Sequence, residues 1–423
     1  MILWPKSINH LLFVNINHYQ FKAAFCNGSS FFYFYPLKKT SLQTIKNKQL
    51  YFPLLDTTRF IAFVPVFLTH CFITSNQTIE NTNWFKQITH FLDFGLLGLD
   101  YFFVLSSFLI TRLIIDERLQ FKTFSFKLFF IRRSLRIWPL YFLMVAIGFI
   151  SFYAGLIHTP LPPLIHFVSF TLNLYIANNG YNFLFFLVFL WSISVEEQFY
   201  IFWGVLLNTA SKISAKCFQY CIPITAILLI ALSLFYRYTH LDDELKLYFH
   251  TFSVTANFGV GILLAYLSAY SKWFVPFVER LSNKSISLLF IILLLSICTY
   301  TIVFTSPFTI LLERIYFSFL FASIISVLCY SSITSWLQKF FNPFDYLGKI
   351  ALGLYFYHGI ILTIYSKLML QFPIAEQAWQ VMVLNPLIML TLSIICASFS
   401  YNYFEKPILA FKNKFYRHLK STA

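Results

Sequence analysis

A guanidinium and an imidazole mark the two ends of one apolar stretch, from Arg59 to His70. The two residues are eleven positions apart, about three helical turns, so their side chains fall on one face. They lie ~16 Å apart along the axis, which puts His70 near mid-membrane if Arg59 lies at the membrane edge. An ionisable group at that depth indicates function, and neutral imidazole is a suitable general base. The alternative is a histidine hydrogen-bonded inside a helix bundle.

Two adjacent carboxyl groups, Glu196 and Glu197, interrupt a second apolar stretch. A carboxyl group costs about 2.5–3.5 kcal/mol near the middle of a membrane helix, so both must meet water, a cavity or a cation. Adjacent helix positions diverge by about 100°, so the two cannot line one cavity equally. Ser192 and Tyr200 extend this polar region along the helix. A structural salt bridge to a basic loop is the alternative interpretation.

Arg133 and Arg136 lie three positions apart in a strongly basic segment between two apolar stretches. Residues three apart on a helix are neighbours, so the two guanidinium groups can bind one anion. Phosphate is a suitable anion because the forked N–H donors of guanidinium match its oxygens. The alternative is that both arginines only anchor the chain at the membrane surface, as most basic loops do.

His358 lies in a later apolar stretch beside Tyr355 and Tyr357. We interpret it first as a hydrogen-bonded histidine of a helix bundle, and second as a polar group near an acceptor. Taken together, the basic segment, His70 and the acidic pair would form a cationic entrance, a buried base and an acidic patch. This combination favours the transfer of a group from a cytoplasmic donor to another acceptor.

The composition indicates that membrane helices must position these groups. Of 423 residues, 58% are hydrophobic and 21% aromatic, and only 11% are charged. A soluble domain carries about a quarter charged residues, so this chain has more apolar surface than water tolerates. The net charge of +15 comes from Lys and Arg gathered in loops, which is typical of membrane orientation and does not indicate nucleic-acid binding. The seven cysteines form no CxxC pattern, so neither a disulfide framework nor a zinc site is predicted.

We predict an all-α, polytopic transmembrane helix bundle of about ten spans and one short re-entrant or interfacial helix. The short helix is expected at 164–177, because a crossing there would place the later basic loops outside the cell. Without that crossing, every basic loop and both termini lie on the cytoplasmic side of the cell (inner) membrane. The spans are expected near residues 58–76, 91–113, 138–156, 190–208, 221–238, 250–269, 286–304, 309–331, 350–370 and 382–404.

Three segments are expected along the chain. Residues 1–50 form an N-terminal extension, interfacial or poorly ordered, because their aromatic run is too short to cross and is broken by Pro36. Residues 51–408 form the membrane domain, and residues 409–423 form a basic cytoplasmic tail. The N-terminus has no signal-peptide pattern.

Five motifs, in this order over residues 52–408, resemble those of the acyltransferase 3 family, whose members are integral membrane enzymes that O-acylate sugars and related acceptors. They are Arg59-x10-His70, a Phe-Phe-x-Leu-Ser-Gly-Phe-Leu-Ile-like segment from Phe102 to Thr111, Arg133-x-x-Arg136 with Pro139 and Tyr141, Ser192-x4-Glu197-x2-Tyr200, and Phe404-Glu405-Lys406-Pro407. Two departures are present. Ser107 replaces the usual glycine, and Thr57-Thr58 replaces the usual Gly-Leu before Arg59.

The resemblance implies an acyl-CoA donor, usually acetyl-CoA, that binds from the cytoplasmic side as a substrate, with no metal. It implies a hydroxyl acceptor on a carbohydrate, glycan or glycolipid. Many members carry a fused extracytoplasmic esterase-like domain, and none is expected here because the chain ends at Ala423.

Three groups of candidate residues follow from the resemblance and from the residues themselves. Catalytic candidates are His70, Arg59 and Glu197; donor-binding candidates are Arg133, Arg136, Ser106 and Tyr141; acceptor-binding candidates are Ser192, Glu196, Tyr200 and His358. His70 would take the proton of the acceptor hydroxyl or carry the acyl group covalently. Arg59 would orient the thioester, and Glu197 would position the acceptor or His70.

Two other functions remain as alternatives. A proton-coupled secondary transporter would also use intramembrane His, Glu and Arg, but inverted internal repeats, its usual signature, are absent from the sequence. An inert scaffold with the same fold is the other. The acceptor, the acyl chain length and a homodimeric state stay open.

Overall fold

The chain divides into two units, residues 1–51 and 52–423. The computed structural model describes residues 12–16, 19–23, 35–36, 52–74, 76–156, 158–371 and 377–411. In the first unit, an antiparallel sheet of order β1-β2-β3 comprises β1 (Leu12–Ile16), β2 (Tyr19–Ala23) and β3 (Tyr35–Pro36). Most of the predicted extension at 1–50, and most of the tail at 409–423, lies outside the described residues, so the expectations for both stay predictions.

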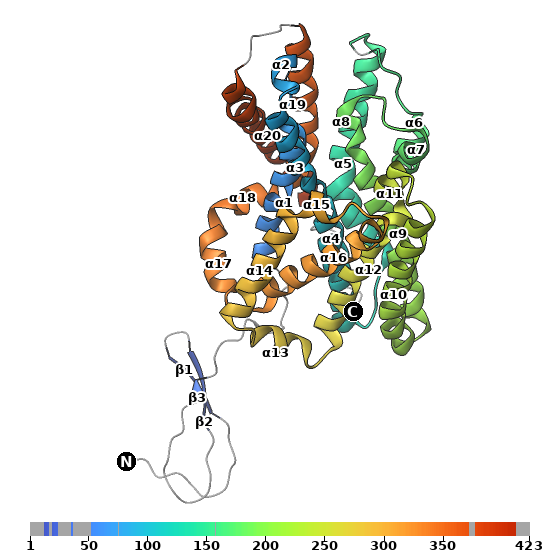
Figure 1. The fold of residues 1–423 in the computed structure, drawn as a ribbon. Helices are drawn as coiled ribbons and strands as arrows, with labels where there is room; N and C mark the ends of the chain where they lie inside the picture. Colours follow the sequence, from blue (N-terminus) through green and yellow to red (C-terminus); the bar gives the residue numbers. More distant parts are fainter. Residues whose placement is uncertain are drawn as a thin grey trace, which may run out of the picture. The chain divides into compact units, whose positions relative to one another are not determined.

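The second unit consists of helices joined by short connections, with no strand in its described residues (Figure 1). Its first half contains α1 (Pro53–Cys71), α2 (Gln77–Glu80), α3 (Asn83–Phe91), η1 (Leu92–Leu96), α4 (Leu97–Phe121), α5 (Phe126–Tyr153), α6 (Leu164–Val168), α7 (Leu172–Asn179), α8 (Phe185–Val188) and α9 (Leu190–Ile213). Its middle contains α10 (Ala215–Thr239), α11 (Glu244–Phe249), α12 (Thr251–Tyr270), α13 (Phe274–Glu279), α14 (Asn283–Cys298), α15 (Tyr300–Val303) and α16 (Pro307–Tyr330).

The C-terminal part of this unit begins with a broken helix and ends with a long one. It contains α17 (Thr334–Phe341), η2 (Asn342–Phe344), α18 (Asp345–Lys349), α19 (Ala351–Gln371), η3 (Gln380–Leu384), α20 (Asn385–Ser400) and η4 (Tyr401–Glu405). Both η3 and η4 are π-helical turns at the ends of α20. Helix α1 packs against α19 and α20, while α5 packs against α8 and α9 (Figure 1).

The prediction of an all-α polytopic membrane bundle is confirmed for this unit. Among the described residues, eight helical segments are long and apolar enough to cross a membrane, or nine if a pair bent by 60° between α18 and α19 counts as one span. The stretch predicted as a span at 286–304 contains a shorter helix than expected, because α14 ends at Cys298 and a separate short helix, α15, follows. The stretch 164–177 forms the short helices α6 and α7, neither of which is long enough to cross.

Close helix packing depends on small residues of α12, which lies between α10 and α4. A Cβ atom on Gly259 would come within 2.6 Å of the Ala226 carbonyl oxygen of α10. A Cβ atom on Gly261 would come within 2.0 Å of the Ser107 Oγ atom of α4. The serine that replaces the family's glycine therefore has room because its neighbour on α12 is itself a glycine. Small residues allow this approach where helix backbones nearly touch.

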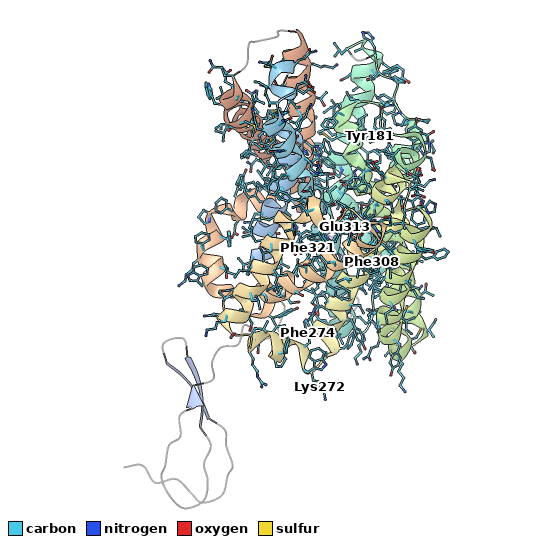
Figure 2. All side chains as sticks on the ribbon, viewed as in Figure 1. Tyr181, Lys272, Phe274, Phe308, Glu313 and Phe321 are labelled. Carbon is cyan, nitrogen blue, oxygen red and sulfur yellow. The ribbon has the colours of Figure 1, made fainter. Side chains whose placement is uncertain are left out.

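An interior ion network joins α4, α10 and α16, and its charged members are Asp100, Arg237, Glu313 and Arg314. Arg314 pairs with Asp100, and Arg237 pairs with Glu313 at 3.2 Å. Asn257 donates to Asp100 at 2.5 Å, and Tyr300 donates to the other oxygen of Glu313 at 2.7 Å. Figure 2 shows Glu313 within the helical unit, far from Lys272 at its edge. The charges of this network are matched one for one, so we interpret it as structural.

Candidate active site

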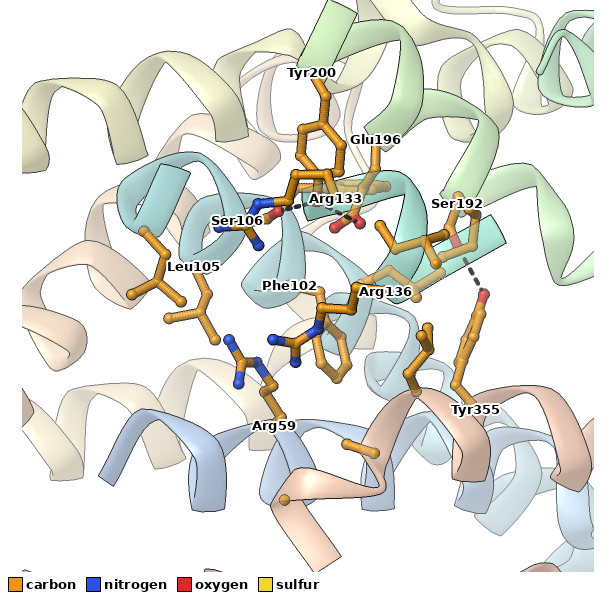
Figure 3. A pocket seen from close by; sticks show the side chains of 18 residues that line it. Arg59, Phe102, Leu105, Ser106, Arg133, Arg136, Ser192, Glu196, Tyr200 and Tyr355 are labelled. Atoms are coloured by element: carbon orange, nitrogen blue, oxygen red, sulfur yellow. Dashed lines mark hydrogen bonds between the residues drawn. The ribbon is translucent and has the colours of Figure 1, made fainter. Parts of the chain in front are cut away.

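A polar pocket opens between α1, α4, α5, α9 and the break between α18 and α19, with an empty volume of about 860 Å³ including its open side. Its polar lining residues are Arg59, Ser106, Arg133, Arg136, Ser192, Glu196, Tyr200 and Tyr355 (Figure 3). Leu99, Phe102 and Leu109 contribute an apolar wall. We call this the cationic pocket, because three of its lining side chains are guanidinium groups and only one is a carboxylate.

The three guanidinium groups gather on one side of the cationic pocket. Figure 3 shows Arg59 of α1 and Arg136 of α5 pointing toward one another, with Arg133 beside Ser106. The positive charges of Arg59 and Arg133 both act on Arg136. Among the described residues, Arg136 has no hydrogen-bond or ion-pair partner within bonding distance. Like charges held together in a partly buried site favour the binding of an anion.

Helix phase decides which arginines of the basic segment reach the pocket. Arg133 and Arg136 are three apart on α5 and both line it, as their spacing predicted. Arg132 points elsewhere and pairs with Glu117 of α4 at 2.6 Å, with both side chains buried. The segment therefore combines a structural ion pair with two residues that line the pocket.

Arg59 is held in place by contacts of the residues just before it, Asp56, Thr57 and Thr58. It pairs with Asp56 one turn earlier on α1. Thr58 accepts a hydrogen bond from Tyr101 of α4 at 2.6 Å, and Thr57 donates to Asp345 of α18. The two threonines thus fix this turn of α1 to α4 and α18. The sequence pattern alone did not predict these partners, because both lie far along the chain.

A chain of hydroxyl groups leads from α4 to Glu196. Ser106 Oγ lies 2.5 Å from the Tyr200 hydroxyl oxygen, and that hydroxyl donates to Glu196 at 2.8 Å (Figure 3). Three predicted site residues are therefore brought together on one wall of the pocket. The arrangement can hold a polar group of a ligand or relay a proton along the wall.

The adjacent carboxyls diverge, as expected for neighbouring helix positions. Glu196 lines the cationic pocket, but Glu197 does not. Glu197 is fully buried within the helix bundle. Neither of its carboxylate oxygens has a hydrogen-bond partner among the described residues. The acid available to a ligand in the pocket is Glu196.

His70 lies outside the lining of the cationic pocket and next to a cluster of aromatic rings. Its ring centroid is 5.2 Å from Phe189, 5.8 Å from Phe185 and 6.4 Å from His358. His358 is fully buried, with Nδ1 3.2 Å from the Leu354 carbonyl oxygen. Its other nitrogen, Nε2, has no hydrogen-bond partner among the described residues. Two imidazoles therefore lie near each other but apart from the guanidinium groups.

Tyr141 is also placed away from the pocket. It is fully buried, and its hydroxyl donates to the Phe167 carbonyl oxygen of α6 at 3.0 Å. Tyr141 thus ties α5 to the short helices between the spans. A donor-binding role for Tyr141 stays a prediction.

Tyr355 is a site residue to which the sequence analysis gave no role. Its hydroxyl lies 2.9 Å from Ser192 Oγ and donates to the Phe189 carbonyl oxygen at 3.1 Å. It lines the cationic pocket, and its ring lies 5.7 Å from His358. Its spacing of three residues from His358 was the signal that could have identified it.

Comparisons with known proteins agree with the motifs. A family model described as an acyltransferase domain matches residues 52–401. The peptidoglycan O-acetyltransferase OatA of Listeria monocytogenes serovar 1/2a is 25% identical over 395 residues, which cover 89% of this chain and 58% of that protein. A putative O-acetyltransferase of Staphylococcus aureus strain COL is 28% identical over 388 residues, covering 88% of this chain and 59% of that protein.

A third relative is the putative peptidoglycan O-acetyltransferase YrhL of Bacillus subtilis strain 168. It is 26% identical over 391 residues, covering 85% of this chain and 55% of that protein. The chain thus spans 55 to 59% of the length of these three relatives. No solved structure matches the chain.

Proposed function

The chain belongs to the acyltransferase family whose domain matches residues 52–401, and from this premise we propose that it is a membrane-bound O-acyltransferase. The proposed donor is cytoplasmic acyl-CoA, with acetyl-CoA as the first candidate. The proposed acceptor is a hydroxyl group of a glycan. Peptidoglycan is the first acceptor to test, because two of the relatives are named for its O-acetylation.

The cationic pocket is the observation that carries this proposal. CoA carries several phosphate charges, and Arg59, Arg133 and Arg136 supply guanidinium donors that project into the pocket from α1 and α5. The apolar wall beside them, with Phe102 and Leu109, suits the uncharged arm that ends in the thioester. A pocket with excess positive charge inside a membrane domain supports an anionic substrate rather than a neutral one.

The proposed reaction is an acyl transfer from sulfur to oxygen. The acceptor oxygen attacks the thioester carbonyl carbon, so a C–O bond forms while the C–S bond breaks. His70 takes the proton of the acceptor hydroxyl and passes it to the departing CoA thiolate. Arg59 orients the thioester, and the wall from Ser106 through Tyr200 to Glu196 positions polar groups of the substrates. Glu197 lies outside the pocket, so we propose Glu196 as its acid.

The proposed membrane orientation follows from the loop charges. The pocket is lined mostly by residues in the first halves of α1, α4, α5 and α9, and its two arginines on α5 belong to a segment rich in Lys and Arg. Such segments favour the cytoplasmic side, which is where acyl-CoA is found. We propose that both termini are cytoplasmic and that the chain resides in the inner membrane. A homodimer stays a prediction.

The test is mass spectrometry of cell-envelope glycans from cells with the protein, without it, and with His70→Ala. The proposal expects a mass difference of one acyl group that depends on the protein and on His70. The variant must insert in the membrane at the wild-type level. Proton-coupled uptake by proteoliposomes without acyl-CoA consumption would favour the transporter alternative instead.

A further inference from the structure

The cationic pocket and His70 must work on one thioester if the proposed function holds, yet a layer of side chains separates them. We propose that Tyr355, held by Ser192, closes a partition between the cationic pocket and His70. The closed partition keeps the bound thioester from water until the acceptor arrives. The partition consists of Tyr355, Ser192 and Phe189. This inference rests on the proposed acyl transfer and assigns Tyr355 as its positioning residue.

Tyr355 reaches both sides of the partition. Its hydroxyl lines the cationic pocket together with Ser192. Its ring packs at 5.8 Å from Phe189 and 5.7 Å from His358. Phe189 in turn lies 4.5 Å from His358 and 5.2 Å from His70. A thioester held by the guanidinium groups therefore meets Tyr355 and Phe189 before it meets either imidazole.

Two hydrogen bonds hold the Tyr355 hydroxyl against the first turn of α9. One joins it to Ser192 at 2.9 Å, and the other runs to the Phe189 carbonyl oxygen at 3.1 Å. The two partners are three residues apart, Phe189 just before α9 and Ser192 in its first turn, and all three members of the partition are buried. Hydrogen bonds in such a dry environment fix side chains strongly, because no water competes for the partners.

The ring of Phe189 is fixed from the opposite side by a glycine of α19. A Cβ atom on Gly359 would come within 2.6 Å of the Phe189 ring. The ring therefore fills the space that a side chain at Gly359 would take. Phe189 cannot rotate toward Gly359, because its ring is already in close contact there. Opening the partition therefore requires the Tyr355 hydroxyl to leave its hydrogen-bond partners.

The consequence is selectivity between water and the acceptor. Water that reaches the thioester would add across the C–S bond, giving the free acid and CoA. A closed partition keeps the catalytic imidazole from activating that water when no acceptor is bound. Loss of the Tyr355 hydroxyl should therefore raise acyl-CoA hydrolysis and lower the fraction of turnovers that reach the acceptor.

The activity test compares Tyr355→Phe, which keeps the ring, with wild type in the full chain in nanodiscs. Hydrolysis of acetyl-CoA without acceptor should rise roughly five- to tenfold, the change expected for loss of one or two hydrogen bonds. Ser192→Ala should act in the same direction with a smaller rise. Tyr357→Phe, the same change on the same helix but outside the pocket lining, should leave hydrolysis at the wild-type rate. Equal hydrolysis in Tyr355→Phe and wild type would overturn the partition.

A second measurement does not depend on activity. Diethyl pyrocarbonate labels accessible imidazoles, and mass spectrometry resolves each histidine. Labelling of the buried His358, relative to the exposed His90, should rise severalfold in Tyr355→Phe and fall again when CoA fills the pocket. Unchanged labelling would overturn the partition. A chain that neither binds nor consumes acetyl-CoA would refute the proposed function, while the labelling result would still decide the partition.

Discussion

The interior ion network and the cationic pocket each hold four Asp, Glu or Arg side chains inside the same helix bundle, yet their charges are matched differently. The network contains two acids and two bases, each paired with an opposite charge. The pocket is lined by three guanidinium groups and the single carboxylate of Glu196. Asp56 offsets Arg59 from outside the lining, and a positive excess still remains. The charges of the network balance one another within the protein, whereas we propose that an anionic ligand balances those of the pocket.

This difference shows that burial of a charge is by itself a weak sign of function. The members of the network bridge three long helices and use their hydrogen bonds within the protein. Arg136, in contrast, has no such partner among the described residues although it is partly buried. Asp56 and Glu405 act on Arg136 only from beyond bonding distance. A cation in a membrane bundle that forms no ion pair within bonding distance is the stronger sign of a binding site.

The largest effect is expected from breaking the network. Arg314→Met leaves Asp100 buried without its cation, which should lower the free energy of unfolding by about 3–5 kcal/mol. Thermal unfolding of the purified chain in detergent measures this loss. Asp100→Asn combined with Arg314→Met should recover most of it, and the exposed Lys272→Met should change nothing. A single variant as stable as wild type would show that the network is not structural.

The second-largest effect is expected in the pocket, where loss of an arginine should weaken ligand binding without lowering the free energy of unfolding. Arg136→Ala should weaken CoA binding about 10- to 100-fold, the range for a lost hydrogen bond to a charged group. Its unfolding free energy should stay the same or rise, since a repulsion is removed. Lys127→Ala, an exposed cation on the same helix, is the matched control. A lower free energy of unfolding with unchanged CoA binding would show that Arg136 is structural, as the members of the ion network are.

A moderate effect is expected where α18 packs against α1 beside the pocket. A Cβ atom on Gly348 would come within 2.0 Å of the Asp56 carbonyl oxygen, so Gly348→Ala should push α18 away from α1 near Arg59. Overpacking of this kind costs about 1–3 kcal/mol and should also weaken CoA binding. Gly353→Ala is the control, because its nearest contact would be 3.2 Å. Equal behaviour of the two variants in unfolding and calorimetry would contradict this account.

The smallest effect is expected at the departure from the family motif. Ser107→Gly removes a hydroxyl whose one hydrogen bond within the described part of the chain is to the Val104 carbonyl oxygen of its own helix, at 3.0 Å. The unfolding free energy should fall by no more than about 1 kcal/mol. Acyl transfer should proceed at the wild-type rate. A large change in turnover would give Ser107 a role in the reaction that its position outside the pocket lining does not support.

The membrane bundle and the cationic side of the pocket could be predicted from the sequence. Long apolar stretches require membrane helices, and a spacing of three residues places Arg133 and Arg136 on one helix face. The same phase argument predicted that Glu196 and Glu197 would diverge. These features depend on local periodicity, which a single sequence contains.

The separation of His70 from the pocket could not be predicted. It depends on Phe189, between α8 and α9, and on Tyr355 of α19, which meet only in the folded chain. The interior ion network was missed for the same reason, although Glu313 and Arg314 are adjacent charges inside a predicted span. Two adjacent charges within an apolar stretch are the signal from which the network could have been predicted.

We propose that the guanidinium groups of the cationic pocket bind the phosphate groups of the donor. Calorimetry of the purified chain with CoA and with 3′-dephospho-CoA, for wild type and Arg136→Ala, tests it most directly. We predict that wild type binds CoA, binds dephospho-CoA more weakly, and loses affinity for CoA as salt rises or Arg136 is removed. Equal affinity for the two compounds, together with unchanged binding by Arg136→Ala, would contradict the account.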